Sequence, residues 1–244
     1  MMKTEIYVAT HKAYTFPDIP EYIPIHVGKA LTDLDLNIQG DNTGENISNL
    51  NKSFCELTAL YWMWKNSNAD IVGLAHYRRY LVDDVNYKNF INHQIVNPSY
   101  VQEVIQKNKS VVFLPKKEYL KHHKFFCYTV KSHYSKFHNE RDWKILRDII
   151  SNKYPEYLHA FKQIEEKKGF SLYNMFIAHR DFLNAYCNWV FSILFELKSK
   201  INIAEYDVYQ ARIFGFISER LLNVYILKNQ DKLEIKYLDT AKID

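Results

Sequence analysis

Apolar residues recur along this chain in two spacings, as short runs and as longer stretches of helical period. Runs rich in β-branched and aromatic residues predict strands at 5–10, 70–76, 110–115 and 171–179, and an alternating run predicts an edge strand at 232–238. Helical spacing predicts helices at 51–66, from Pro98 onward, and at 139–150, 155–169, 182–197 and 209–227. Strands interleaved with helices are typical of an α/β fold.

The segments between these elements are polar or irregular. Residues 16–25 contain prolines and are too irregular for a helix, and residues 37–48 are dense in Gly, Asn, Asp and Ser, which predicts a loop. Residues 116–138 hold six lysines, four histidines and several aromatic residues without clear periodicity. With no repeat and no linker, the chain is predicted to form a single domain over 1–244. Residues 116–170 would be a helical, basic insertion that contacts an acceptor or a membrane.

Composition limits the classes of partner. The 244 residues are 47% hydrophobic, enough for one substantial core, and the formal net charge is +4. This excess is weaker than that of duplex-binding proteins, so no nucleic-acid partner is expected, and it suits a phosphate-bearing ligand or an anionic membrane surface equally well. The three cysteines form no CxxC pair, and no apolar leader or spanning run occurs. We therefore expect a cytoplasmic protein, peripheral on the inner face of the membrane if it docks there.

Polar clusters follow the first two predicted strands. They are Thr10, His11 and Lys12, and then His76, Tyr77, Arg78 and Arg79. Open α/β sheets bind ligands at the carboxyl ends of their strands, and the planar guanidinium of arginine matches phosphate oxygens. The clusters therefore predict a diphosphate site. The alternative is that the arginines pair with Asp83, Asp84 or a helix end.

Several other residues are candidates for chemistry. Asp41 and Asn42 lie in the polar loop, where they could contact a nucleotide or cap a helix. Ser53 and Glu56 fit a capping box, although Glu56 could also bond a ligand hydroxyl. Glu219 interrupts an apolar helix, where it could act as a base or form an interhelical ion pair. Asn174 would project from its strand, where it could bond a sugar or form a buried amide contact. No metal-binding motif is present.

Four segments together carry a family resemblance. They are GDNTGENISNLNKSFCELTALYWMWKN, VGLAHYRRYL, LYNMFIAHRDFLNAYCNWVFSILFEL and ARIFGFISERLLNVYI. In this order and spacing they resemble a bacterial family of capsule and exopolysaccharide gene clusters, whose domain of formerly unknown function has been assigned to glycosyltransferases. The resemblance covers residue 5 to about residue 228. The combination of CELTALYW with HYRRY is specific, whereas neither half is so alone.

The resemblance implies a GT-A-like, Rossmann-like nucleotide-sugar fold with a mostly parallel central sheet. It implies transfer of a sugar, such as galactose in the furanose or pyranose form, from a UDP-sugar to a growing lipid-linked glycan. GT-A enzymes usually hold a divalent metal with Asp-x-Asp, but the corresponding strand here ends in His76-Tyr77-Arg78. We therefore expect the fixed cations to replace the metal, with no cofactor required and neither Mn²⁺ nor Mg²⁺ expected.

Roles follow for individual residues. Thr10, Lys12, Asp41 and Asn42 would contact the nucleotide, and His76, Arg78 and Arg79 the diphosphate, with His11, Tyr77 and Asn174 beside them. An inverting reaction needs a carboxylate base, for which Glu219 is the first choice and Asp41 the second. The alternative function is a non-catalytic carbohydrate- or nucleotide-binding subunit of a polysaccharide assembly complex.

Overall fold

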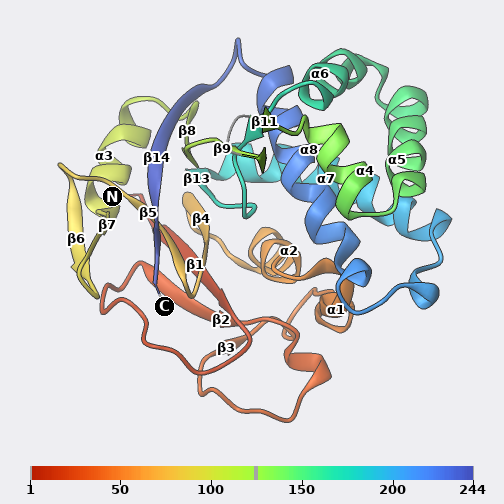
Figure 1. Cartoon of the computed structure of the whole chain (residues 1–244). Coiled ribbons are helices and arrows are strands. Elements are labelled where there is room, and N and C mark those ends of the chain that lie inside the picture. Colours follow the sequence, from red (N-terminus) through yellow and green to blue (C-terminus); the bar gives the residue numbers. More distant parts are fainter. Residues whose placement is uncertain (1, 124–125, 244) are drawn as a thin grey trace.

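A ten-stranded mixed sheet runs through the molecule (Figure 1). The computed structural model describes residues 2–123 and 126–243. In sheet order the strands are β3 (Gln39–Gly40), β2 (Tyr22–His26), β1 (Thr4–Thr10), β4 (Ile71–His76), β13 (Phe176–His179), β8 (Val111–Pro115), β14 (Glu234–Lys242), β5 (Arg79–Val82), β7 (His93–Val96) and β6 (Tyr87–Phe90).

The expectation of a mostly parallel sheet is only partly right. Strands β3, β2, β1 and β4 are parallel neighbours, and β8 is parallel to β14. Strand β13 is antiparallel to both β4 and β8, and β5 is antiparallel to β14 and β7. The chain reverses directly after His76, so that His76 pairs with Arg79 across a tight β4–β5 connection. This reversal places the two arginines of the HYRRY motif in different surroundings.

Most helices cover one side of the sheet, and α3 lies on the other (Figure 1). The helices are α1 (Asn51–Phe54), α2 (Leu57–Asn66), α3 (Pro98–Lys107), α4 (Val130–Phe137), α5 (Glu140–Lys153), α6 (Pro155–Glu165), α7 (Arg180–Lys200) and α8 (Ile213–Lys228). Short 3₁₀ turns lie at η1 (Lys29–Leu31), η2 (Ser48–Leu50), η3 (Ile203–Glu205) and η4 (Gln210–Arg212). Two small sheets pair β10 (Lys121–His123) with β11 (Phe126–Cys127) and β12 (Gly169–Phe170) with β9 (Glu118–Tyr119).

The larger core lies between the sheet and the helical layer. The periodic apolar positions of the helix predicted at 182–197, observed as α7, are buried, with Tyr186 1% exposed and Ile193 and Leu197 fully buried. Helix α8 is apolar on nearly all sides because it lies inside this layer, where it contacts α1, α6 and α7. Burial of apolar surface against α8 therefore fixes where its few polar side chains can point.

Several predicted elements differ from those observed. The strand predicted at the edge of the sheet over 232–238 is β14, which lies inside the sheet because it pairs with β8 on one side and β5 on the other. The helix at 51–66 is broken at Cys55 and Glu56 into α1 and α2. The strand at 171–179 is formed only by Phe176–His179, and a turn precedes it. The irregular segment at 16–25 contains most of β2, whose Pro24 pairs with Val8 of β1, while β3 pairs with the following residues Ile25 and His26. The basic segment at 116–138 contains β9, β10, β11 and α4; its residues Lys124 and Phe125 lie outside the described part of the chain.

Asp41 anchors the polar loop that precedes α1. Its carboxylate is completely buried and accepts hydrogen bonds from the backbone amides of Gly28 (2.8 Å) and Lys29 (3.1 Å) and from the Ser48 hydroxyl. Both oxygens are thus occupied inside the protein. The structure therefore favours a role in holding the loop over the predicted roles of Asp41 in nucleotide contact and catalysis.

We expect Asp41→Ala to lower the free energy of unfolding by about 2–3 kcal/mol, because two buried amides and a hydroxyl lose their acceptor. Urea unfolding measures the change. Asp33→Ala, at an exposed position, is the matched control and should change stability by less than about 0.5 kcal/mol. Equal stability of the two variants would contradict the anchoring role.

Candidate functional site

A left-handed turn at Tyr173 and Asn174 organises the candidate site. Their φ angles are +71° and +53°, in a region that non-glycine residues seldom adopt. Asparagine tolerates this conformation better than most residues, whereas tyrosine does not. Both positions use their side chains, which glycine could not supply. The Tyr173 hydroxyl donates to Glu118 Oε1 (2.8 Å), and the Asn174 amide is buried.

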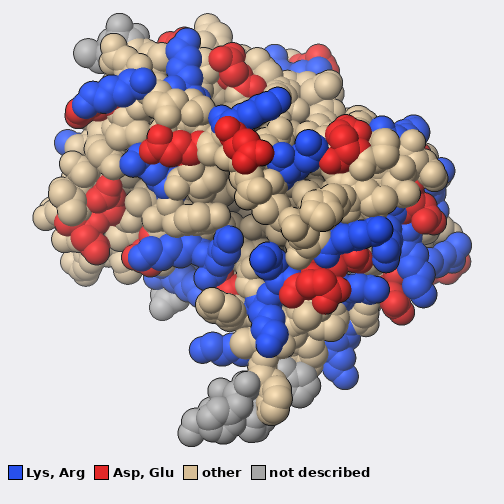
Figure 2. Space-filling model, turned by 90° about the horizontal axis from the view of Figure 1, so that it is seen from above, with Lys and Arg blue, Asp and Glu red and all other residues tan. Residues whose placement is uncertain are grey.

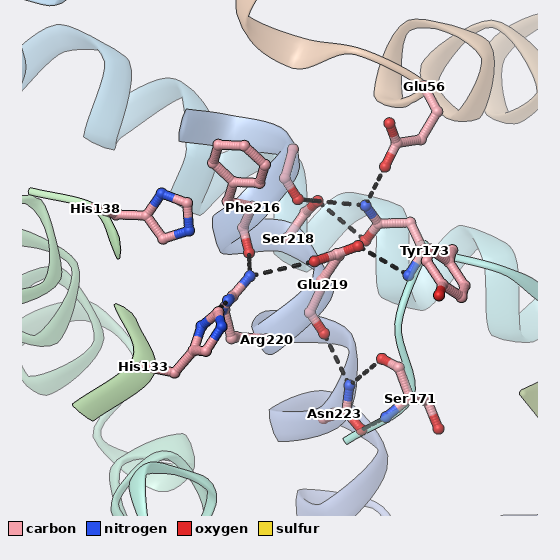
Figure 3. Close-up of polar contacts among 12 residues, drawn as sticks. Glu56, His133, His138, Ser171, Tyr173, Phe216, Ser218, Glu219, Arg220 and Asn223 are labelled. Carbon is pink, nitrogen blue, oxygen red and sulfur yellow. Dashed lines mark hydrogen bonds and ion pairs between the residues drawn. The ribbon is translucent and has the colours of Figure 1, made fainter. Parts of the chain in front are cut away.

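The turn contacts three titratable side chains from three distant segments. The Tyr173 amide donates to Glu219 Oε1 (2.8 Å), and the Tyr173 carbonyl lies 2.7 Å from His76 Nε2. Asn174 Nδ2 donates to Glu56 Oε1 (2.6 Å), and this bond is the dashed line that ends on the labelled Glu56 in Figure 3. The turn therefore gathers Glu56, His76 and Glu219 at one place. Asn174, expected to project from a strand, instead performs this function from the turn that precedes β13.

Glu56 reaches this turn because the helix at 51–66 is broken. Cys55 has a φ of +53°, which ends α1 and redirects the chain before α2 begins at Leu57. The Glu56 side chain makes no capping hydrogen bond, so the predicted capping box is wrong. Among the described residues, Glu56 Oε2 accepts no hydrogen bond. One carboxylate oxygen is therefore fixed by Asn174 while the other is free.

Glu219 is held more tightly. Its Oε1 accepts from the Tyr173 amide, and its Oε2 lies 3.2 Å from Arg220 Nη1 (Figure 3). Burial raises the pKa of Glu219 to about 7 against the opposing effect of Arg220, and the nearby Glu56 raises it further. Glu219 is thus both a member of an ion pair and a carboxyl group that titrates near neutral pH.

Arg220 occupies an aromatic enclosure behind Glu219. Its side chain is 3% exposed, and its guanidinium lies 4.9 Å from the ring centre of Phe170 and 5.6 Å from that of Tyr134. Nη1 also donates to the Phe216 carbonyl (2.6 Å), and Nη2 lies 3.5 Å from His133 Nδ1. Burial, and then Arg220 itself, lower the pKa of His133 to about 4. His133 is therefore neutral at physiological pH and can accept from Arg220.

A cavity of about 670 Å³ opens beside Glu56. Its walls are formed by α1, the β4–β5 connection and the segment before α8. The lining residues are His11, Val27, Asn51, Lys52, Cys55, Glu56, Arg78, Tyr206, Val208, Ala211 and Arg212. Partial burial lowers the pKa of His11, and the nearby cations Lys12, Arg78 and Arg212 lower it further. Cationic groups thus converge on the cavity, with one carboxylate, Glu56, in its lining.

The predicted diphosphate residues separate into two groups. His11 and Arg78 line the cavity, and Lys12 and Arg78 lie 5.5 and 5.1 Å from the ring centre of the buried Tyr77. Arg79 is not among the lining residues; its guanidinium lies 4.4 Å from the Tyr173 ring centre, and its buried Nε has no hydrogen-bond partner in the described part of the chain. Neither arginine forms an ion pair with a described residue.

The remaining predicted residues have local or peripheral positions. The Thr10 hydroxyl is buried and donates to the Lys12 carbonyl (2.7 Å), which shapes the end of β1. Asn42 is exposed in its loop. His76 lies beside the turn, where burial lowers its pKa despite the proximity of Glu56. His76 is therefore neutral and donates through Nε2 to the Tyr173 carbonyl.

The sequence did not identify Lys52 or Arg212 as site residues, and it indicated Glu56 mainly as a capping residue. Arg212 is exposed on the segment just before α8, and its Nε lies 3.4 Å from the Cys55 sulfur. Lys52 and Glu56 lie within predicted helical periodicity, which concealed them. The only available signal was the resemblance, since Lys52 and Glu56 fall in its first segment and Arg212 in its last.

The described residues contain no group of three or more His, Cys, Asp or Glu side chains arranged to hold a metal ion. Within the same residues, no helix is long and apolar enough to cross a membrane.

Comparison with known proteins places this geometry in a family. Residues 5–230 match the model of a domain of unknown function, DUF4422. The fold is similar to the apo structure of WbbM, a bifunctional glycosyltransferase, with 32% sequence identity and a TM-score of 0.87. That similarity covers 99% of this chain and 45% of the WbbM chain, so this chain spans less than half of that enzyme. No curated protein matches.

We expect Glu219→Gln to destabilise the protein by about 3–5 kcal/mol, because Arg220 is then buried without a counter-charge. The double variant Glu219→Gln/Arg220→Met should recover part of this loss in urea unfolding. If the two single losses simply add, Glu219 and Arg220 are not coupled.

Arg220→Met should lower the free energy of unfolding more at pH 8 than at pH 6. Glu219 has a raised pKa in the folded state, so stability falls as pH rises from its unfolded value toward about 7. Without Arg220 the pKa of Glu219 in the folded state rises further, and the decrease in the free energy of unfolding therefore continues above pH 7. Unfolding at both pH values measures the difference, and an equal cost would show that Arg220 does not influence the ionisation of Glu219.

Proposed function

The chain belongs to the DUF4422 family, and from that premise we propose that it transfers a sugar from a UDP-sugar to a growing, lipid-linked capsular or exopolysaccharide glycan. The similarity to one portion of a bifunctional glycosyltransferase supports glycosyl transfer as the reaction class. Galactose, in its furanose or pyranose form, is the sugar we propose.

One observation carries the proposal: cations and a carboxylate line the same cavity. Lys52, Arg78 and Arg212 form its cationic wall, His11, whose pKa is lowered, lies beside them, and Glu56 faces the same space. A departing UDP gains negative charge as the bond from the sugar to its phosphate breaks. Guanidinium groups fixed in the wall stabilise that charge without reorganisation. We therefore propose a donor site that works without a divalent metal.

We propose Glu56 as the base of an inverting transfer, in preference to Glu219. The acceptor hydroxyl attacks C1 of the donor sugar and loses its proton to Glu56 Oε2. The bond from C1 to the phosphate oxygen breaks, and its electron pair leaves with UDP. Glu56 lines the cavity and has a free oxygen, whereas both oxygens of Glu219 already accept hydrogen bonds. Asn174 holds Glu56 in place, and the neutral His76 holds the turn that carries Asn174.

UDP-sugar at about 100 times its Kd should stabilise the protein by about 2.7 kcal/mol, visible as a rise in melting temperature that EDTA does not remove. Arg78→Ala and Arg212→Ala should each reduce the rise, while the apo variants melt as the parent does because both side chains are exposed. Lys109→Ala, at an exposed position in the turn after α3, is the control and should retain the rise. A shift that depends on Mn²⁺, or survives in both arginine variants, would contradict the cationic site.

Glu56→Gln should lower the rate of sugar transfer by about 10²–10⁴-fold, because the glutamine cannot accept the acceptor proton. Its donor-induced thermal shift should remain, since the amide keeps the shape of the side chain. Release of UDP from donor and acceptor measures the rate. Near-parental activity of Glu56→Gln would exclude Glu56 as the base. Absence of any UDP release by the parent protein would instead favour a non-catalytic binding subunit.

A further inference from the structure

A short hairpin lies between the sheet strand β8 and helix α4 in the chain. Strand β10 pairs antiparallel with β11, and β9, which precedes the hairpin, pairs with β12. Figure 2 shows Lys and Arg side chains over much of the lower part of the face seen from above. The hairpin begins beside the candidate site, because Glu118 of β9 accepts the hydrogen bond from the Tyr173 hydroxyl.

Two aromatic side chains in and beside this hairpin face solvent. Phe126 of β11 is 70% exposed and Tyr119 of β9 is 68% exposed, more than any other aromatic side chain in the described part of the chain. Leu120 is buried, so its neighbours Tyr119 and Lys121 point away from the core. A single exposed aromatic side chain is common, but two so close in the chain are available to enter an apolar or interfacial layer.

Lysines surround these aromatic residues. Lys121 begins β10 and Lys131 lies in the first turn of α4, and Lys167 and Lys168 lie in the segment between α6 and β12. The Lys168 carbonyl accepts from the Leu120 amide (3.0 Å), and the Lys167 carbonyl accepts from the Val130 amide (2.8 Å). None of the four lysines forms an ion pair with a described residue. The nearby acids are Glu118, engaged by Tyr173, and Glu166.

We propose that this face docks on an anionic lipid surface. The docking face is formed by Tyr119, Lys121, Phe126, Lys131, Lys167 and Lys168. Basic residues within a Debye length of an anionic leaflet are attracted to it, and exposed aromatic side chains such as Tyr119 and Phe126 insert at the headgroup level. The free lysines complement the negative charge of such a surface.

The proposal deepens the proposed function and rests on it in one respect: a lipid-linked acceptor lies at a membrane. The hydrogen bond between Tyr173 and Glu118 ties the docking hairpin to the turn that holds Glu56. Docking would thus present the catalytic cavity to an acceptor carried on that membrane.

Co-sedimentation of the full chain with vesicles tests the docking face. We expect binding to vesicles of phosphatidylglycerol and phosphatidylcholine, weakened by salt, and little binding to phosphatidylcholine alone. Lys121→Gln should weaken binding about fivefold, and Lys121→Gln/Lys168→Gln about 25-fold. Phe126→Ser should weaken it without altering its salt dependence.

The matched control is Lys109→Gln/Lys198→Gln, which removes the same charge from exposed positions on other elements and should bind as the parent does. Equal weakening by the control would overturn the docking face, as would binding to phosphatidylcholine alone as strong as to anionic vesicles. Binding of RNA in preference to either vesicle would also overturn it. Because the assay contains no nucleotide, its failure would leave the donor-induced thermal shift, and hence the proposed function, untouched.

Discussion

The left-handed turn at Tyr173 and Asn174 is the constraint on which the candidate site depends. Two consecutive non-glycine residues in this conformation cost on the order of 1–3 kcal/mol each. The surrounding hydrogen bonds offset that cost, since the turn bonds Glu56, His76 and Glu219 through an amide, a carbonyl and a side chain. If a relaxed loop replaced this turn, Glu56, His76 and Glu219 would lose these hydrogen bonds together. Strain held by many contacts at a cavity is typical of functional sites.

Charge is distributed unevenly around this turn. On one side Arg220 is buried among aromatic rings and neutralised by Glu219. On the other side the cations Arg78 and Arg212 have no such partner among the described residues and face the cavity. A buried guanidinium needs a carboxylate near it, whereas an unpaired cationic wall is suited to an anion from outside. The same residue type is thus paired with a carboxylate in the interior and left available to an anion at the cavity.

Helix α8 connects the two sides. Arg212 precedes its first turn at the cavity, Phe216 follows one turn later, and Glu219 and Arg220 follow one turn after that. The approach of α8 to α1 is close: a side chain at Gly215 would lie 3.3 Å from the Cys55 sulfur. This contact brings the broken helix that carries Glu56 toward the helix that carries Glu219, and a larger residue at position 215 would require Cys55 to shift by a few tenths of an ångström.

The sequence by itself determined the elements whose signal is local. Residue type and spacing predicted the apolar face of α7 and the buried strands β1, β4 and β8. They also predicted a cluster of basic residues that includes His11 and Arg78. Only the tertiary structure decided which acid lines the cavity. The oxygens of Asp41 accept hydrogen bonds from amides distant in the chain, whereas the backbone break at Cys55 brings Glu56 to the cavity. It also decided that Arg78 and Arg79 diverge, and that Asn174 lies in a turn. Such outcomes depend on contacts between residues far apart in the chain, and local periodicity carries no information about them.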